Sequence, residues 1–192
     1  RDRLRSRGLG DVYKRQVYAC AARDIHTVYV FNHSDRDLTD YLERLKKAID
    51  KEDVKVVQCK AVEELVRNSD IICTTTPSTT PVLPDDKELL RGKCIIAIGS
   101  YMPEMREIPD AVLDLVDNVY IELPYACEES GDLSQPLASG KLTKDRIKLM
   151  HEYLISGEKE IKEGQTTYFK SVGMGLFDVC IAQKLYEVAK EK

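Results

Sequence analysis

The sequence predicts an α/β fold, a Rossmann-like doubly wound parallel sheet. After Val17, short β-branched or apolar segments alternate with segments whose apolar residues recur at helical spacing, the pattern of a parallel sheet with crossover helices. Apolar runs also open abruptly into polar loops, as in A-I-G-S-Y-M-P-E-M-R-E at residues 97–107. Such a change is typical of the C-terminal ends of buried parallel strands, where ligands bind. A chain of 192 residues, 43% of them hydrophobic, can bury one core.

The elements can be placed along the chain from these patterns. Strands are predicted at residues 27–31, 54–57, 70–75, 94–98, 119–121 and 165–169, and helices at 38–49, 62–68, 143–155 and 174–189. Residues 17–23 have the pattern of the end of a helix. The first strand of the sheet, and the glycine-rich turn that should follow it, are therefore expected to be missing, which leaves the sheet incomplete.

The first sixteen residues have an unusual composition. S-R-G-L-G-D-V-Y-K-R-Q at residues 6–16 matches, residue for residue, the translation of a transposon-end adapter used in sequencing libraries. We expect residues 1–16 to be adapter-derived, the alternative being a genuine basic N-terminal arm. No strand-like segment precedes G-L-G, and a dinucleotide-binding turn requires strand, turn and helix in that order. Gly8 and Gly10 are therefore not expected to bind a phosphate.

Composition excludes several classes of function. The net charge of −4 and the isoelectric point near 5.5 argue against a nucleic-acid partner. No apolar run approaches the length of a membrane span, so no membrane partner is expected. Most of the six cysteines lie in apolar patterns and none forms a C-x-x-C pair, which predicts buried free thiols and a cytoplasmic location. His26 and His151 have no second ligand at metal spacing, so no metal site is expected.

The end of the first predicted strand carries the residues N-H-S-D-R. In dinucleotide folds an acidic residue at this position binds the ribose hydroxyls, and an Arg nearby accommodates a 2′-phosphate. Here the position holds neutral Asn32, followed by His33, Ser34 and Arg36. A hydroxyl and a cation suit a phosphate dianion, so NADP(H) is favoured over NAD(H), which stays possible. Alternatively, Ser34 caps the next helix and His33 is a solvated loop residue.

Three further strand ends are candidates for the same crevice. Small or hydroxyl-bearing residues there allow a flat nucleotide to approach the backbone, and a helix after the last strand could direct its N-terminal amides at an anion. The candidate cofactor-binding residues are Thr75 and Thr76 at one strand end, Ala97, Gly99 and Ser100 at the next, and Lys170, Ser171, Val172 and Gly173 at the last. Lys170 could equally be a solvated charge.

The order of these segments resembles the ornithine cyclodeaminase/mu-crystallin family. The resemblance runs from Val17 to the C-terminus and depends on N-H-S, D-I-I-C-T-T-T-P-S, A-I-G-S-Y-x-P-x-M-R-E, E-S-G-D-L and F-K-S-V-G-M. It implies an NAD(P)-binding domain at residues 17–164, with a strand and helix at 165–192 that return toward a substrate and dimerisation domain, and hence a homodimer. In the family, the glycine fingerprint and the basic residues that bind the substrate carboxylate lie upstream. These 192 residues alone are therefore expected to be inactive.

Tyr101 separates the reactions that the family catalyses. The resemblance implies a catalytic Asp at this position in cyclodeaminases and in the related alanine dehydrogenases. A tyrosine, with its ordinary pKa of about 10, is a poor base near neutral pH. We therefore expect an NADPH-dependent reductase of small, cyclic 2-imino acids, with its catalytic residue unassigned. The alternatives are an ornithine cyclodeaminase with bound NAD, and an NADPH-dependent binding protein of the mu-crystallin type without turnover.

The remaining charged residues are expected to have structural roles. Arg106 and Glu107 are predicted to form a local ion pair that fixes their loop. Glu128, Glu129 and Asp132 lie beside a glycine and are predicted to face water. An acidic group at residues 85–88 suits the start of a helix.

Overall fold

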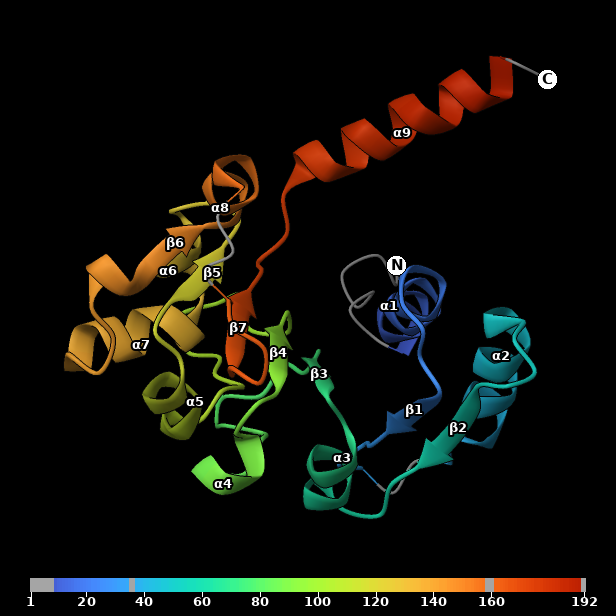
Figure 1. The fold of residues 1–192 in the computed structure, drawn as a ribbon, viewed down its shortest axis with the longest axis horizontal. Coiled ribbons are helices and arrows are strands. Elements are labelled where there is room, and N and C mark those ends of the chain that lie inside the picture. Colours follow the sequence, from blue (N-terminus) through green and yellow to red (C-terminus); the bar gives the residue numbers. More distant parts are fainter. Residues whose placement is uncertain (1–8, 35–36, 158–160, 191–192) are drawn as a thin grey trace.

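Parallel strands alternate with helices along most of the chain (Figure 1). The computed structural model describes residues 9–34, 37–157 and 161–190. The elements are α1 (Leu9–Ala22), β1 (Thr27–Val30), α2 (Thr39–Ile49), β2 (Lys55–Gln58), α3 (Val62–Asn68), β3 (Ile71–Thr74), α4 (Lys87–Leu90), β4 (Cys94–Ala97), α5 (Asp110–Leu115), β5 (Val119–Ile121), α6 (Ala126–Glu129), α7 (Gly131–Ser139), a 3-10 turn (Lys144–Arg146), β6 (Ile147–Leu149), α8 (Met150–Ser156), β7 (Thr167–Lys170) and α9 (Gly175–Lys190).

The strands form two parallel sheets. β1 pairs with β2, and a five-stranded sheet has the order β3-β4-β7-β5-β6. Among the described residues no strand lies between β1 and β3, and Figure 1 shows the first pair set apart from the larger sheet. The prediction of a parallel α/β fold is confirmed.

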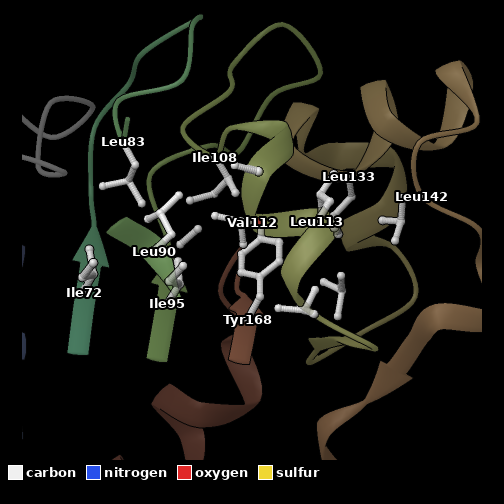
Figure 2. Packing of buried hydrophobic residues seen from close by; sticks show 14 of the residues in the cluster. Ile72, Leu83, Leu90, Ile95, Ile108, Val112, Leu113, Leu133, Leu142 and Tyr168 are labelled. Carbon is white, nitrogen blue, oxygen red and sulfur yellow. The ribbon is translucent and has the colours of Figure 1, made fainter. Parts of the chain in front are cut away.

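Each sheet has its own hydrophobic cluster. The larger one, under β3–β7, includes Ile95, Leu113 and Tyr168, and Figure 2 shows these side chains gathered between the sheet and the covering helices. The smaller one joins β1 to α1 and α2 and includes Val28 and Leu45. The four-residue strands of β1 and β4 each bury alternate side chains more deeply, as expected where one face is packed more tightly than the other.

Helix ends follow local chemistry. The carboxylate of Asp86 accepts hydrogen bonds from the backbone amides of Glu88 and Leu89 and so caps α4, as the acidic group at 85–88 predicted. α2 ends at Asp50 in the left-handed conformation, and α7 ends at Gly140, with a φ of 77°. α1 begins at Leu9, so Gly10 lies within a helix and Gly8 lies outside the described residues.

The predicted helix over residues 143–155 is wrong in its first half. A 3-10 turn at Lys144–Arg146 leads into strand β6, and only Met150–Ser156 is α-helical. The reason is tertiary. Ile147 and Leu149 pair with Val119 and Ile121 of β5 and pack against the larger cluster, so sheet pairing overrides the helical spacing of the apolar residues.

The burial expected of the cysteines is confirmed only in part. Burial is confirmed for Cys20 and Cys59 but is wrong for Cys73 and Cys180, which are exposed. No helix in the described part of the chain has the length and apolarity needed to cross a membrane. Within the same residues, no group of His, Cys, Asp and Glu side chains is arranged to hold a metal ion.

Candidate cofactor site at the strand ends

Three predicted site segments follow neighbouring strands. β4 lies between β3 and β7, and all three strands run in the same direction. The loops that begin at Thr75, Ile98 and Ser171 therefore leave the sheet along one edge. The structure thus brings together Thr75 and Thr76, Gly99 and Ser100, and residues 171–173, in the position where parallel sheets bind ligands.

The side chain of Glu107 joins the loops after β3 and β4 through hydrogen bonds. Its side chain is fully buried and accepts hydrogen bonds from the Thr74 hydroxyl at 2.9 Å and from the Gly99 amide at 2.7 Å. The second carboxylate oxygen accepts from the amide of Thr76 at 2.5 Å and from its hydroxyl at 2.8 Å. One carboxylate therefore fixes the ends of both β3 and β4.

Gly99 is required at this crossing by lack of space. A Cβ atom there would lie 2.1 Å from the Thr76 carbonyl oxygen, 2.3 Å from its amide nitrogen and 2.6 Å from Glu107 Oε1. Two of these are backbone atoms, so a side-chain rotation cannot relieve the overlap. The glycine lets the two loops approach closely enough for Glu107 to bind both.

A second buried pair extends this network toward β7. Asp132 Oδ1 accepts hydrogen bonds from the amides of Glu107, at 2.7 Å, and Ile108, at 3.0 Å. Its Oδ2 atom lies 3.5 Å from Lys170 Nζ, and both side chains are fully buried. The same ammonium lies 3.3 Å from the Ala97 carbonyl oxygen, which it can donate to. Lys170 is thus neither a solvated charge nor directed at the open edge of the sheet.

Burial shifts the pKa of each group in this network. It raises the pKa of Glu107, although the hydrogen bonds from Thr76 and Thr74 act in the opposite direction. It also raises the pKa of Asp132, while the nearby Lys170 cation counteracts the shift. Burial lowers the pKa of Lys170, and the Asp132 and Glu107 carboxylates oppose that change. The charges of these three groups are therefore stabilised by one another and by buried hydrogen bonds, and not by water.

The loop after β7 is fixed by a different carboxylate. Glu122, which follows β5, is buried, and its Oε1 atom accepts hydrogen bonds from the Ser171 hydroxyl and from the amides of Val172 and Gly173 at 2.6–2.9 Å. Gly173 has a φ of 88° and nothing within 4 Å of a built Cβ. Glu122 therefore fixes the buried side of this turn, while the side that faces away from Glu122 at Gly173 is open.

The end of β4 and the end of β1 differ in burial. Ser100 is buried, and its hydroxyl lies 2.7 Å from both the Met105 carbonyl oxygen and the Ser130 hydroxyl, so it serves the loop's own structure. Tyr101, the next residue, is half-buried. After β1, the Asn32 amide donates to the exposed Ser34 hydroxyl at 2.8 Å, and His33 is exposed. Arg36 lies outside the described residues.

Sequence reasoning missed the residues that organise the site. Arg106 pairs with Asp110 and not with Glu107, so the predicted local ion pair is wrong. The solvent-facing role predicted for Asp132 is also wrong, because only 1% of the residue is exposed. A carboxylate that follows the glycine of E-S-G-D-L gives no sign of burial by itself. A useful signal would have been Lys170, a lysine at the end of an apolar strand, which needs a buried acidic partner such as Asp132.

The pKa shift of Glu107 predicts a pH effect on stability. The folded chain holds this proton more tightly than the unfolded chain, so the contribution is greatest below the ordinary pKa of 4.5 and is lost as the pH rises through the folded value. Glu107→Gln should lower the free energy of unfolding by about 2 kcal/mol at neutral pH, because an NH2 group replaces one of the two carboxylate oxygens and leaves the donors on that side, at Thr76 or at Gly99 and Thr74, without an acceptor. Its stability should also fall less steeply with pH than that of the wild type above pH 4.5.

Urea unfolding at a series of pH values measures both effects. The exposed Glu104→Gln, in the same loop, is the matched control and should retain the wild-type slope. Equal pH slopes for wild type and Glu107→Gln would show that Glu107 does not titrate in this way.

Comparison with known proteins agrees with this architecture. The family profile described as "Ornithine cyclodeaminase/mu-crystallin family" matches residues 6–192. The Delta(1)-pyrroline-2-carboxylate reductase of Bacillus cereus is 34% identical over 175 residues, which cover 90% of this chain and 52% of that protein. The ketimine reductase mu-crystallin of Mus musculus is 34% identical over 135 residues, 70% of this chain and 40% of that protein. The chain thus spans about half the length, or less, of these curated relatives.

Solved structures share the fold. The probable ornithine cyclodeaminase from Bordetella pertussis superposes with a TM-score of 0.79 at 26% identity, covering 94% of this chain and 56% of that one. The Thermococcus litoralis Delta(1)-pyrroline-2-carboxylate reductase, solved with NADH and L-proline, gives a TM-score of 0.82 at 22% identity, covering 94% of this chain and 55% of that one. Because the family profile covers nearly the whole chain, this protein belongs to the ornithine cyclodeaminase/mu-crystallin family.

Proposed function

We propose that the full-length protein is an NADPH-dependent reductase of small 2-imino acids, cyclic ones such as pyrroline-2-carboxylate included. The observation that carries the proposal is Tyr101, a non-acidic residue at the end of β4, where the resemblance implies the catalytic Asp of cyclodeaminases. The names of the Bacillus cereus and mouse relatives, both reductases of C=N compounds, support the same reading. Cyclodeamination starts from an amine and needs a carboxylate as general base at this position. Without that carboxylate, reduction of an imine is the reaction that the position supports.

Two places along the strand ends support the proposal of a nicotinamide cofactor. The open side of the turn at Ser171–Gly173 and the side chain of Thr75 offer small, polar surfaces along the edge of the sheet. The amide of Asn32 and the hydroxyl of Ser34 offer partners beyond β1. When bound, the nicotinamide would supply a hydride to the imine carbon, and the imine nitrogen would take a proton. In this proposal Glu107 fixes the positions of the loops after β3 and β4, and Glu122 fixes the loop after β7, so that the cofactor and the imine can be oriented toward each other.

A steady-state assay tests the proposal. The full-length protein should oxidise NADPH in the presence of pyrroline-2-carboxylate and form proline, while the 192-residue chain alone should show no turnover. Formation of proline and ammonia from ornithine with NAD would instead establish a cyclodeaminase. Tight NADPH binding with no turnover of any cyclic imine would establish a binding protein.

The preference for NADPH is proposed from Asn32, in the loop that follows β1. Neutral Asn32 does not repel a 2′-phosphate, and Ser34 can donate to one. Asn32→Asp in the full-length protein should weaken NADPH binding at least about tenfold, equivalent to about 1.4 kcal/mol, and affect NADH binding much less. Fluorescence titration of the two cofactors measures this ratio. The exposed Asp37→Asn, on the same segment, is the control, and an unchanged ratio in Asn32→Asp would contradict the assignment.

We also propose that the protein is a homodimer and that α9 takes part in the interface. Figure 1 shows α9 extending away from both sheets. Its large apolar side chains are exposed, among them Phe177, Ile181 and Leu185 at 49–65%. Contiguous apolar surface of this kind is typical of an interface. Sedimentation velocity of the full-length protein should give the mass of a dimer, and a monomer would contradict the proposal.

A further inference from the structure

The segment E-S-G-D-L at residues 129–133 spans the start of α7 and packs against the loop of residues 100–106, here called the β4 loop. Gly131 is the point of close approach. A Cβ atom there would lie 2.1 Å from the Met105 carbonyl oxygen and 2.4 Å from that of Pro103. Both are backbone atoms, so only glycine lets the helix lie this close to the loop.

Hydrogen bonds from α7 hold the β4 loop at successive residues. The Gly131 amide donates to the Met102 carbonyl oxygen at 3.1 Å. The Gln135 side chain donates to the Pro103 carbonyl oxygen at 2.9 Å. The position of the loop is therefore set by the helix, through backbone atoms that do not depend on the loop's own side chains.

The first two side chains of the β4 loop differ in burial. The hydroxyls of Ser100 and Ser130 lie 2.7 Å apart, and both residues are fully buried. The Ser100 side chain is thus directed at the start of α7. Tyr101, the next residue, is only half-buried, so part of this large residue is accessible to a ligand.

Tyr101 lies at the edge of the sheet where the proposed cofactor contacts lie. β4 is the middle strand of β3, β4 and β7, so the β4 loop leaves the sheet between the loop that contains Thr75 and the turn at Ser171–Gly173. Ligands of parallel sheets bind across such strand ends. A half-buried aromatic residue at this middle position can therefore form one wall of the space in which the imine meets the cofactor.

An aromatic wall distinguishes between imines of different shape. The side chain of Tyr101 offers a flat, largely apolar surface, and each methylene group that packs on such a surface strengthens binding roughly fourfold. The ring of a cyclic 2-imino acid presents adjacent methylene groups to it, whereas the imine of pyruvate presents a single methyl group. The wall therefore favours the cyclic compound.

We propose that Tyr101 is the specificity-determining residue of the imine site, where its ring packs against the methylene groups of a cyclic 2-imino acid, and that α7 positions it through the β4 loop. The inference rests on the proposed reductase function and adds to it the feature that selects cyclic over acyclic imines. Gln135 and Ser130 are positioning residues, since they contact the loop and not the ligand.

Steady-state kinetics of the full-length protein measure the selectivity, as the ratio of kcat/KM for pyrroline-2-carboxylate to kcat/KM for the imine of pyruvate. Tyr101→Ala should lower this ratio at least about tenfold, mainly through KM, because packing on the methylene groups is lost. Tyr101→Phe keeps the ring and should preserve the ratio. Retained NADPH binding shows that both variants are folded. An unchanged ratio in Tyr101→Ala, or an equal loss in Tyr101→Phe, would overturn the proposal.

Gln135→Glu tests the positioning role of α7. The carboxylate keeps the shape of the side chain but cannot donate to the Pro103 carbonyl oxygen. The ratio should fall at least about threefold, and hydrogen exchange should become faster at the amides of Gly131 and Met105, whose hydrogen bonds hold the same loop. Gln58→Glu, at an exposed position of β2, is the matched control and should change neither quantity. Wild-type values of both in Gln135→Glu would refute the positioning role.

A binding measurement separates this inference from the proposed function. Pyrrole-2-carboxylate is a planar, unreactive analogue of the cyclic imine, and calorimetric titration of the full-length protein loaded with NADP⁺ gives its affinity. If the wild type reduces no imine but binds the analogue at least about tenfold more tightly than Tyr101→Ala, the role of Tyr101 stands and the reductase function fails. Turnover with equal affinity and equal ratio in the two proteins would leave the function and overturn the role of Tyr101. Neither turnover nor binding would overturn both.

Discussion

Replacing Lys170 by methionine is expected to lower the free energy of unfolding by about 3–5 kcal/mol. The substitution keeps most of the side-chain volume but removes the cation beside Asp132, whose Oδ2 lies 3.5 Å from Lys170 Nζ in a fully buried position. Asp132 would then be a buried carboxylate without a counterion. Urea unfolding, with hydrogen exchange of the β4 amides as a local measure, determines the loss.

Two further variants make this expectation specific. Lys148→Met, on an exposed position of β6, should change the stability by no more than about 0.5 kcal/mol. Adding Asp132→Asn to Lys170→Met should recover part of the loss, since an amide can still accept from Glu107 and Ile108 and carries no charge. A double variant that is less stable than Lys170→Met alone would refute the buried-charge explanation.

Gly99→Ala is expected to cost about 3 kcal/mol, the upper part of the range for overpacking. The added methyl group would overlap the Thr76 backbone, with a Cβ to carbonyl oxygen distance of 2.1 Å. To make room, the loop after β3 must move away from the loop after β4, and Glu107 can then no longer bind both. In the full-length protein the same change should also abolish cofactor binding.

Gly175→Ala is the matched control. A Cβ at Gly175 meets nothing within 4 Å, and the residue begins α9, where alanine is the better helix former. Its unfolding free energy should be equal to or slightly above that of the wild type. Wild-type stability for Gly99→Ala would mean that the two loops are not in contact in solution.

The sequence predicted the strands well because their signals are local. The β-branched run at β1 and the apolar run at β4 predict strands whatever surrounds them, and the structure places both there. The segment that became β6 has no such run. Ile147 and Leu149 become a strand only because β5 offers a free edge, and that information lies almost thirty residues away in the chain.

The sequence predicted the turn residues of the candidate site but not the buried carboxylates that hold those turns in place. Residue types such as those of Gly99 and Thr76 are typical of turns and therefore indicate where a strand ends. Glu107 and Asp132 are charged residues in polar loops, and charge alone favours the solvent-exposed reading. Their burial follows from donors on three separate segments, Thr74 to Thr76, Gly99 and Lys170, which only the folded sheet brings together.

The presence of two hydrophobic clusters has a consequence for cooperativity. Val28 and Leu45 share no cluster with Ile95 or Tyr168, so little apolar burial couples the β1–β2 part to the rest. Regions that share few buried contacts open as separate cooperative units, each with its own free energy. Thermal or chemical melting of this chain should therefore proceed in two transitions, the smaller unit first.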